Sequence, residues 1–129
     1  MSQSEGQEVM AMNAGHELGR RGENAAVRYL EGLGWRVLAR NWRCAEGELD
    51  IVAHDGSRHV VCEVKTRRSR AYGDPAEAIT ITKALRLRRL AGRWAREHGL
   101  RASSMRIDLI GLVGGGADGF TVDHLKEVA

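Results

Sequence analysis

Apolar residues in the first third of the chain recur at helical spacing. Between residues 16 and 33 they form a stripe that consists of Leu18, Gly22, Ala25, Ala26, Tyr29, Leu30 and Leu33. Residues three and four apart lie on one face of an α-helix, so the pattern predicts an amphipathic helix over this range. Gly32 and Gly34 stand at its end, where glycine is typical of helix termination.

The segment before this helix has no basic start followed by an apolar block, and it carries Glu5 and Glu8. It therefore does not have the pattern of a secretory signal. We predict a disordered leader over residues 1–14, natural or left from cloning. Since 129 residues suit one domain, we expect a single domain over residues 15–129.

The next part of the chain alternates between apolar and polar residues, which is typical of strands. The pattern predicts strands at Trp35–Arg43, Glu48–Ala53 and Val60–Thr66. An Asp-Gly turn signal within His54–Ser57 joins the second and third strands into an antiparallel hairpin.

The second half of the chain starts with a segment that contains its one proline, and Arg67–Ile79 is predicted as a loop. Thr82 is the expected N-cap of a helix over Lys83–His98. Its apolar face consists of Leu87, Leu90, Ala91, Trp94 and Ala95.

Two further strands follow, at Met105–Val113 and Phe120–Leu125, with Gly114–Gly119 as a flexible turn between them. The predicted order is αβββαββ. We therefore expect an α/β fold in which helices flank a mixed central sheet.

Charged residues stand inside the second and third predicted strands, where they are unusual. If the hairpin turn has two residues, Asp50 pairs with Val61 and lies diagonal to Glu63; if the loop has four residues, Asp50 lies opposite Glu63. In both registers Asp50, Glu63 and Lys65 share one sheet face. The group is either a catalytic centre or a cross-strand ion pair on a solvated face.

Two carboxylates this close repel each other, and a hard divalent cation relieves the repulsion. Asp50, Glu63 and the main-chain carbonyl of Val64 suit Mg²⁺ or Mn²⁺, with Lys65 beside the reacting phosphate. Glu23, at the border of the first apolar stripe, joins the site directly or through water, or else is an exposed helix residue.

Basic residues are concentrated in the second half of the chain. The net charge is +3, yet Glu63–Arg106 holds twelve Lys or Arg against four acids. Such a surplus predicts a nucleic-acid partner, the alternative being a solvated helix face. The residues expected to bind phosphate are Arg67, Arg68, Arg70, Lys83, Arg86, Arg89 and Arg93.

No apolar run approaches the roughly 18 residues of a membrane helix, so we expect no membrane partner. Cys44 and Cys62 lack metal-ligand spacing and are expected to be free thiols, in agreement with a cytoplasmic location.

Several motifs together resemble the YraN-like bacterial family of the PD-(D/E)xK nuclease superfamily, which is distantly similar to archaeal Holliday junction resolvases. The matching segments are Gly19–Glu23, Arg40–Arg43, Gly47–Asp50, Glu63–Arg67, Pro75–Ala78 and Arg106–Asp108.

The resemblance implies a restriction-endonuclease-like core and a metal-dependent endonuclease acting on DNA, including branched or structured DNA. It implies that Asp50 and Glu63 bind metal, that Lys65 assists hydrolysis and that Glu23 completes the site. By analogy a homodimer is expected. The superfamily's proline before the aspartate is replaced by Leu49, which removes no ligand.

Two further acids need an interpretation. Glu48 is an auxiliary ligand or a surface residue, and we favour the surface. Asp108 belongs to the family pattern, and we expect it to make a structural hydrogen bond. The rival functions are a catalytically inactive nucleic-acid-binding protein with the same fold and an accessory protein whose basic face binds an acidic partner.

Overall fold

The computed structural model describes residues 3–73, 77 and 79–129, which form two α-helices and a five-stranded sheet. The order is α1 (Gln3–Gly32), β1 (Arg36–Cys44), β2 (Gly47–His54), β3 (His59–Arg67), α2 (Ile81–Glu97), β4 (Arg106–Gly116) and β5 (Gly119–Leu125). The predicted α/β class, the mixed sheet flanked by helices and the order αβββαββ are confirmed. Among these residues, no helix combines the length and apolar character needed to cross a bilayer.

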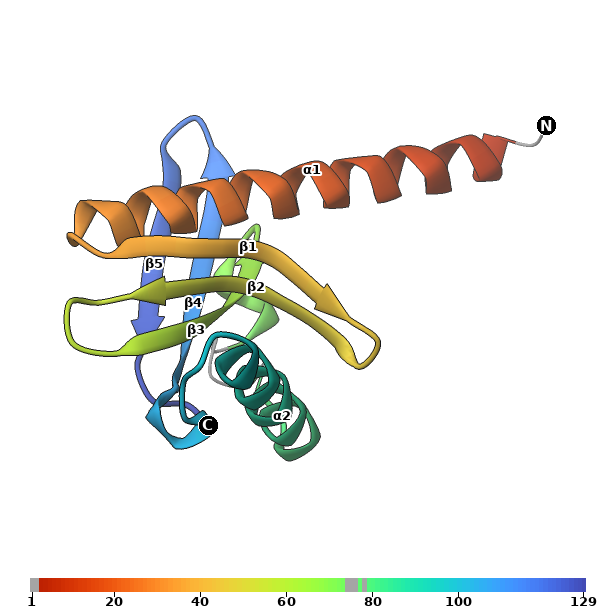
Figure 1. Ribbon diagram of the computed structural model, residues 1–129. Helices are drawn as coiled ribbons and strands as arrows, with labels where there is room; N and C mark the ends of the chain where they lie inside the picture. The colour runs from red at the N-terminus through yellow and green to blue at the C-terminus, as the bar shows by residue number, and fades with distance from the viewer. Residues whose placement is uncertain (1–2, 74–76, 78) are drawn as a thin grey trace.

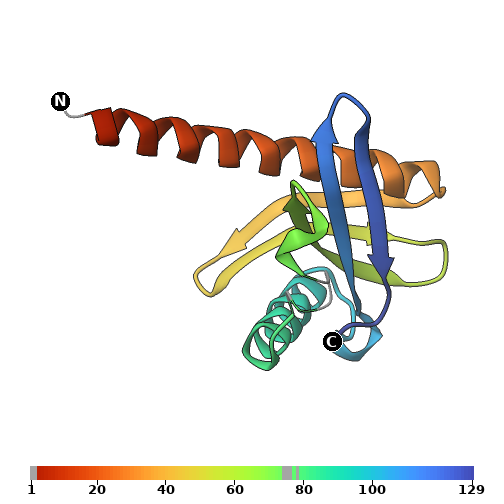
Figure 2. The ribbon, with the colours of Figure 1, turned by 180° about the vertical axis from the view of Figure 1, so that it is seen from behind.

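The strands lie in the sheet in their chain order, β1-β2-β3-β4-β5. Three of the pairs are antiparallel, and β3 pairs with β4 in parallel. A parallel pair needs a crossover connection, and α2 supplies it. Helix α1 lies across one face of the sheet and α2 against the other (Figures 1 and 2).

Helix α1 packs closely on β3 through a glycine. Ala26 and Leu30 are fully buried in the cluster that also contains Ile51. Gly22 is buried too, and a Cβ at this position would overlap the side chain of Thr66. The absence of a side chain at Gly22 therefore sets how closely the helix approaches the sheet. The N-terminal part of α1 projects past the sheet (Figure 1).

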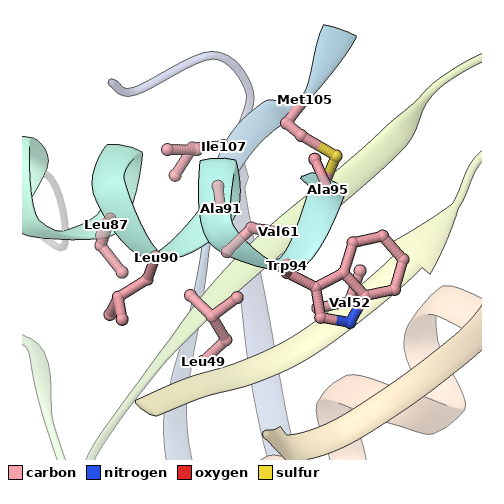
Figure 3. Close-up of a cluster of buried hydrophobic side chains, with 10 residues drawn as sticks. All are labelled: Leu49, Val52, Val61, Leu87, Leu90, Ala91, Trp94, Ala95, Met105 and Ile107. Atoms are coloured by element: carbon pink, nitrogen blue, oxygen red, sulfur yellow. The ribbon is translucent and has the colours of Figure 1, made fainter. Parts of the chain in front are cut away.

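Helix α2 buries the apolar face that its sequence predicts. Figure 3 shows Leu87, Leu90, Ala91, Trp94 and Ala95 of α2 packed against Leu49, Val52, Val61, Met105 and Ile107. All ten side chains are at most 3% exposed. Burial of these residues holds the crossover helix on the sheet.

The first helix is longer than the pattern predicts. It begins at Gln3, within the segment expected to be a disordered leader. This segment has no proline and contains Gln, Glu, Ala and Met, which favour helix even where no apolar stripe is present. The domain boundary at residue 15 stays a prediction.

Two local predictions in the second half are wrong. The N-cap of α2 is Thr80 and not Thr82: the Thr80 side chain accepts a hydrogen bond from the N–H of Lys83, at 3.1 Å. The prediction of a flexible turn over Gly114–Gly119 is wrong because β4 continues to Gly116. Gly114 and Gly115 instead form a bulge at the end of this strand, with φ of 113° and 93°. Glycine reaches positive φ without steric cost. Residues 74–76 and 78 of the predicted loop, which include most of the Pro75–Ala78 motif, lie outside the described residues.

Asp108 makes the structural contacts expected of it. Its carboxylate is fully buried and accepts hydrogen bonds from Arg106, at 2.9 and 3.0 Å, and from the N–H of Glu127, at 3.1 Å. His124 Nε2 lies 2.8 Å away. Burial alone would raise the pKa of Asp108, but the hydrogen bonds from His124, Arg106 and Glu127 outweigh it and lower the pKa.

We expect Gly22→Ala to lower the free energy of unfolding by about 1–3 kcal/mol, because the new methyl group overlaps Thr66. Gly19→Ala is the matched control on the same helix, since a Cβ there meets nothing within 4 Å. The control should be as stable as the original chain or more stable. Urea unfolding measures both, and equal stability of the two variants would contradict the close approach.

We expect Asp108→Asn to lower the free energy of unfolding at pH 7 by on the order of 3 kcal/mol, because Arg106 loses its buried partner. The pKa of Asp108 is lowered in the fold, so its contribution is present above the ordinary Asp pKa of about 4 and is lost as the pH falls below it. Urea midpoints at pH 7 and pH 3 should therefore converge for the two proteins at the lower pH. If the urea midpoints of the two proteins differ equally at pH 7 and pH 3, the pKa of Asp108 is not lowered in the fold.

Candidate functional site

The site forms where β2 and β3 stop pairing. The pairs Ile51 with Cys62 and His54 with His59 show the register with a four-residue loop, the second of the two predicted registers. Beyond Ile51, the Oδ2 atom of Asp50 accepts a hydrogen bond from the N–H of Val64, at 2.8 Å. The side chain of Asp50 thus satisfies a main-chain donor of the neighbouring strand.

Asp50 is an acid in an unfavourable place for a charge. Burial raises the pKa of Asp50 to about 7, with repulsion from Glu63 as the next contribution, and the hydrogen bond from Val64 opposes the rise. Glu23 and Glu48 add smaller repulsions. The negative charge of Glu63, the other predicted metal-binding carboxylate, therefore contributes to the raised pKa of Asp50.

Glu63 is held by a cation of helix α2, which covers the face of the sheet opposite to α1. Its Oε1 atom lies 2.9 Å from Nζ of Lys83, which stands in the first turn of α2. The Glu63 side chain is 13% exposed and that of Lys83 is 25% exposed. Lys83, predicted to bind phosphate, thus contacts one of the predicted metal ligands.

Glu23 is positioned by β1. Its Oε1 atom accepts hydrogen bonds from Nδ2 of Asn41, at 2.9 Å, and from Arg40, at 3.4 Å. Arg40 also donates to Asn24, at 2.7 Å. Asn41 has a φ of 52°, a conformation that Asn tolerates better than most residues.

An open pocket of about 780 Å³ lies between α1 and the ends of β2 and β3. Glu23, Asp50 and Lys65 line it, together with residues of α1 from Asn13 to Arg20. Lys65 is exposed, so its ammonium can move within the pocket. Three of the four predicted catalytic residues therefore share this pocket, and the fourth, Glu63, interacts with Asp50 from beside it.

The pocket continues along α1 as a groove. A neighbouring pocket shares Leu18 and Lys65 with it and is also lined by Arg67 and Arg68. A third shares Leu18 and Arg68 and reaches Gly114–Gly116 at the β4–β5 hairpin. We call these three connected pockets the α1 groove.

The other predicted phosphate-binding residues divide into two groups. Arg67 donates to the carbonyl of Gly73, at 3.1 Å, and Arg70 pairs with Asp123, at 2.9 Å. On α2, Arg86 and Arg89 are exposed, and Arg93 pairs with Glu97, at 3.3 Å, and Glu46, at 3.6 Å. The α1 groove and the α2 arginines are thus two basic regions rather than one.

Sequence reasoning missed the contacts that hold Glu23 and Glu63. With Thr82 as the expected cap, Lys83 is the first residue of the helix. With Thr80 as the cap it is the third residue, still in the first turn, and its ammonium contacts Glu63 of β3. The Arg40-Asn41 motif was visible, but its contact with Glu23 depends on the positive φ of Asn41. Glu48 pairs with Arg43, at 2.7 Å, and its side chain is 33% exposed; its assignment as a surface residue stays a prediction.

The oxygen donors at the centre are the carboxylates of Asp50 and Glu63 and the carbonyl of Val64. Among residues 3–73, 77 and 79–129, no group of three or more His, Cys, Asp or Glu is arranged to hold a metal ion. Asp50, Glu63 and the carbonyl of Val64 still suit Mg²⁺, which takes few protein ligands and keeps several waters. The raised pKa of Asp50 fits the same role, because a cation would relieve the repulsion that raises it.

Comparisons with known proteins identify one family. The profile of "Uncharacterised protein family UPF0102" matches residues 22–112. A UPF0102 protein of Arthrobacter sp. (strain FB24) is 51% identical over 117 residues, which cover 91% of this chain and 99% of the relative. A UPF0102 protein of Streptomyces coelicolor is 51% identical over 120 residues, covering 92% of each chain.

We expect Asp50→Asn to stabilise the protein at pH 8. The pKa of Asp50 is raised to about 7, so the folded state binds a proton more tightly than the unfolded state, and stability is lost as the pH rises from about 4 towards 7. The amide cannot ionise, yet its oxygen can still accept from Val64. The gain should be on the order of 2 kcal/mol at pH 8 and should vanish near pH 4.

Thermal unfolding at both pH values measures this effect. Asp118→Asn, in the exposed β4–β5 turn, is the matched control and should give no gain at pH 8. Millimolar Mn²⁺ should stabilise the original chain at pH 8 more than the Asp50→Asn variant. At each pH, the stability of the variant is compared with that of the original chain. If the advantage of Asp50→Asn is smaller at pH 8 than at pH 4, Asp50 does not carry an unfavourable buried charge.

Proposed function

Since the chain belongs to the uncharacterised UPF0102 family, which is the YraN-like family, we propose that it is a divalent-cation-dependent endonuclease that hydrolyses phosphodiester bonds of DNA. Branched or otherwise structured DNA is the substrate class that the resemblance favours. The observation that carries the proposal is the pair of carboxylates at the β2–β3 divergence, where burial and Glu63 raise the pKa of Asp50 to about 7.

Asp50, Glu63 and the Val64 carbonyl are the groups that would hold Mg²⁺ or Mn²⁺. Such a cation supplies Lewis acidity towards a phosphate oxygen and lowers the pKa of water. The hydrogen bond from Val64 to Asp50, at 2.8 Å, fixes the carboxylate before any ligand arrives. This preorganisation lowers the cost of assembling the centre.

Lys65 has the role of neutralising the phosphate or orienting the attacking water. Its side chain is exposed within the same pocket as Asp50, and an ammonium there stabilises the negative charge that develops on the phosphate oxygens. Glu23 completes the site with a carboxylate held by Asn41, at 2.9 Å, and acts directly or through a water molecule.

The α1 groove is the proposed path of the nucleic-acid backbone. Lys65, Arg67 and Arg68 line it beside the carboxylates, so phosphates bound there would lie next to the reacting centre. Arg70 and the α2 residues Arg86, Arg89 and Arg93 would bind more distant phosphates. This electrostatic binding should weaken as salt concentration rises. A cytoplasmic location and a homodimer, in which two centres address two strands, belong to the same proposal.

A second candidate function is nucleic-acid binding without turnover. The contacts of Lys83 with Glu63, at 2.9 Å, and of Arg40 with Glu23, at 3.4 Å, favour it. Each of these carboxylates already has a cationic partner, as in a fold that keeps its basic surface without catalysis.

The cleavage test uses labelled linear, flap and four-way-junction DNA with Mg²⁺ or Mn²⁺. Glu63→Gln should reduce cleavage at least about 100-fold, because the neutral amide is a poor partner for a hard cation. Glu31→Gln, an exposed change on α1, is the matched control and should cleave like the original chain.

DNA binding measured in parallel separates the two candidate functions. Salt-sensitive binding by every variant, without cleavage in either metal, would replace the nuclease proposal with the binding protein. Cleavage that survives Glu63→Gln would point to a contaminating nuclease and defeat the assignment of the centre.

A further inference from the structure

Lys83 contacts one of the two carboxylates of the centre, that of Glu63. Its Nζ atom lies 2.9 Å from Oε1 of Glu63, and the pair is largely shielded from solvent. The main chain of Lys83 is fixed as well, because its N–H donates to Oγ1 of Thr80 at the helix start, at 3.1 Å. The ammonium is thus presented to β3 by a defined turn of α2.

The ion pair between Lys83 and Glu63 is of a kind that can be broken by a competing cation. Lysine has a flexible stem and an ammonium without fixed planar geometry, so its contact with a carboxylate is easily exchanged. Arg106 shows the opposite case in the same protein, since its planar group makes two hydrogen bonds to the fully buried Asp108, at 2.9 and 3.0 Å. Only the second arrangement has the geometry of a permanent structural pair.

We propose that Lys83 is an internal counter-ion of the carboxylate centre, which occupies Glu63 until a divalent cation takes its place there. This inference rests on the proposed function of Asp50 and Glu63 as cation ligands. The ammonium partly neutralises Glu63 in the free protein and competes with the incoming cation for the same carboxylate. Lys83 acts through Glu63 and is a positioning residue.

A purely structural ion pair between α2 and β3 makes a different prediction. Its loss would lower stability and would leave the affinity for a divalent cation unchanged or weaker. The counter-ion role predicts tighter cation binding when the ammonium is removed, because a competing positive charge next to the site is gone.

The test measures Mn²⁺ binding by the full chain without DNA, by electron paramagnetic resonance and calorimetry. Lys83→Gln should lower the dissociation constant for Mn²⁺ about tenfold. Lys83→Arg should raise it, because a guanidinium holds the carboxylate more firmly. Arg96→Gln, an exposed change in the last turn of α2, removes the same charge at the far end of the helix from Lys83 and should leave the constant unchanged.

A second pair of variants shows whether the effect passes through Glu63. In the Glu63→Gln background, Lys83→Gln should no longer tighten Mn²⁺ binding, since the carboxylate over which the two cations compete is absent. Urea unfolding shows whether each variant folds. If Lys83→Gln does not fold, the measurement is repeated with Lys83→Met, which keeps the apolar stem of the side chain.

The outcomes separate this inference from the proposed function. Equal or weaker Mn²⁺ binding by Lys83→Gln and Lys83→Met, with normal binding by the original chain, overturns the role of Lys83 and leaves the cation site standing. Absence of Mn²⁺ binding by all variants overturns both.

Discussion

The hydrogen bond from the N–H of Val64 to the carboxylate of Asp50, at 2.8 Å, is the constraint on which the rest of the centre depends. This hydrogen bond lies directly beyond the pair Ile51–Cys62, where the regular pairing of β2 with β3 ends. A carboxylate there does two things at once. It satisfies a main-chain donor that would otherwise lack a strand partner, and it is brought close to Glu63, whose repulsion adds to the effect of burial on Asp50.

Asp50 and Asp108 are both shielded from solvent, but their surroundings shift their pKa values in opposite directions. Asp108 is surrounded by Arg106, His124 and a main-chain N–H, which lower its pKa although it is fully buried. In the described part of the chain, Asp50 has one main-chain donor, the N–H of Val64, and acidic neighbours, and its pKa is raised. The first arrangement stabilises the ionised carboxylate in the fold, whereas the second leaves a carboxylate that an external cation can stabilise.

The sequence predicts those features that depend on local periodicity. Alternating apolar residues locate β1 to β3, and helical spacing identifies the buried face of α2, including Leu87 and Trp94. Features that depend on a single backbone angle or a choice between equivalent residues are not predictable in this way. Thr80 and Thr82 are both good caps, and the structure uses Thr80, which places Lys83 two residues farther into the helix than the sequence predicts. The left-handed conformation of Asn41, which brings its amide to Glu23, has no periodic signal.

Strand β1 is an edge strand of the sheet, so its arginines have a second effect besides their side-chain contacts. An unpaired margin offers main-chain groups to which a strand of another molecule can add, and positively charged side chains oppose such addition. Arg36, Arg40 and Arg43 are exposed along this strand. Arg40, which also holds Glu23, therefore contributes to protection against edge-to-edge aggregation, so its replacement would alter colloidal behaviour as well as the acid beside it.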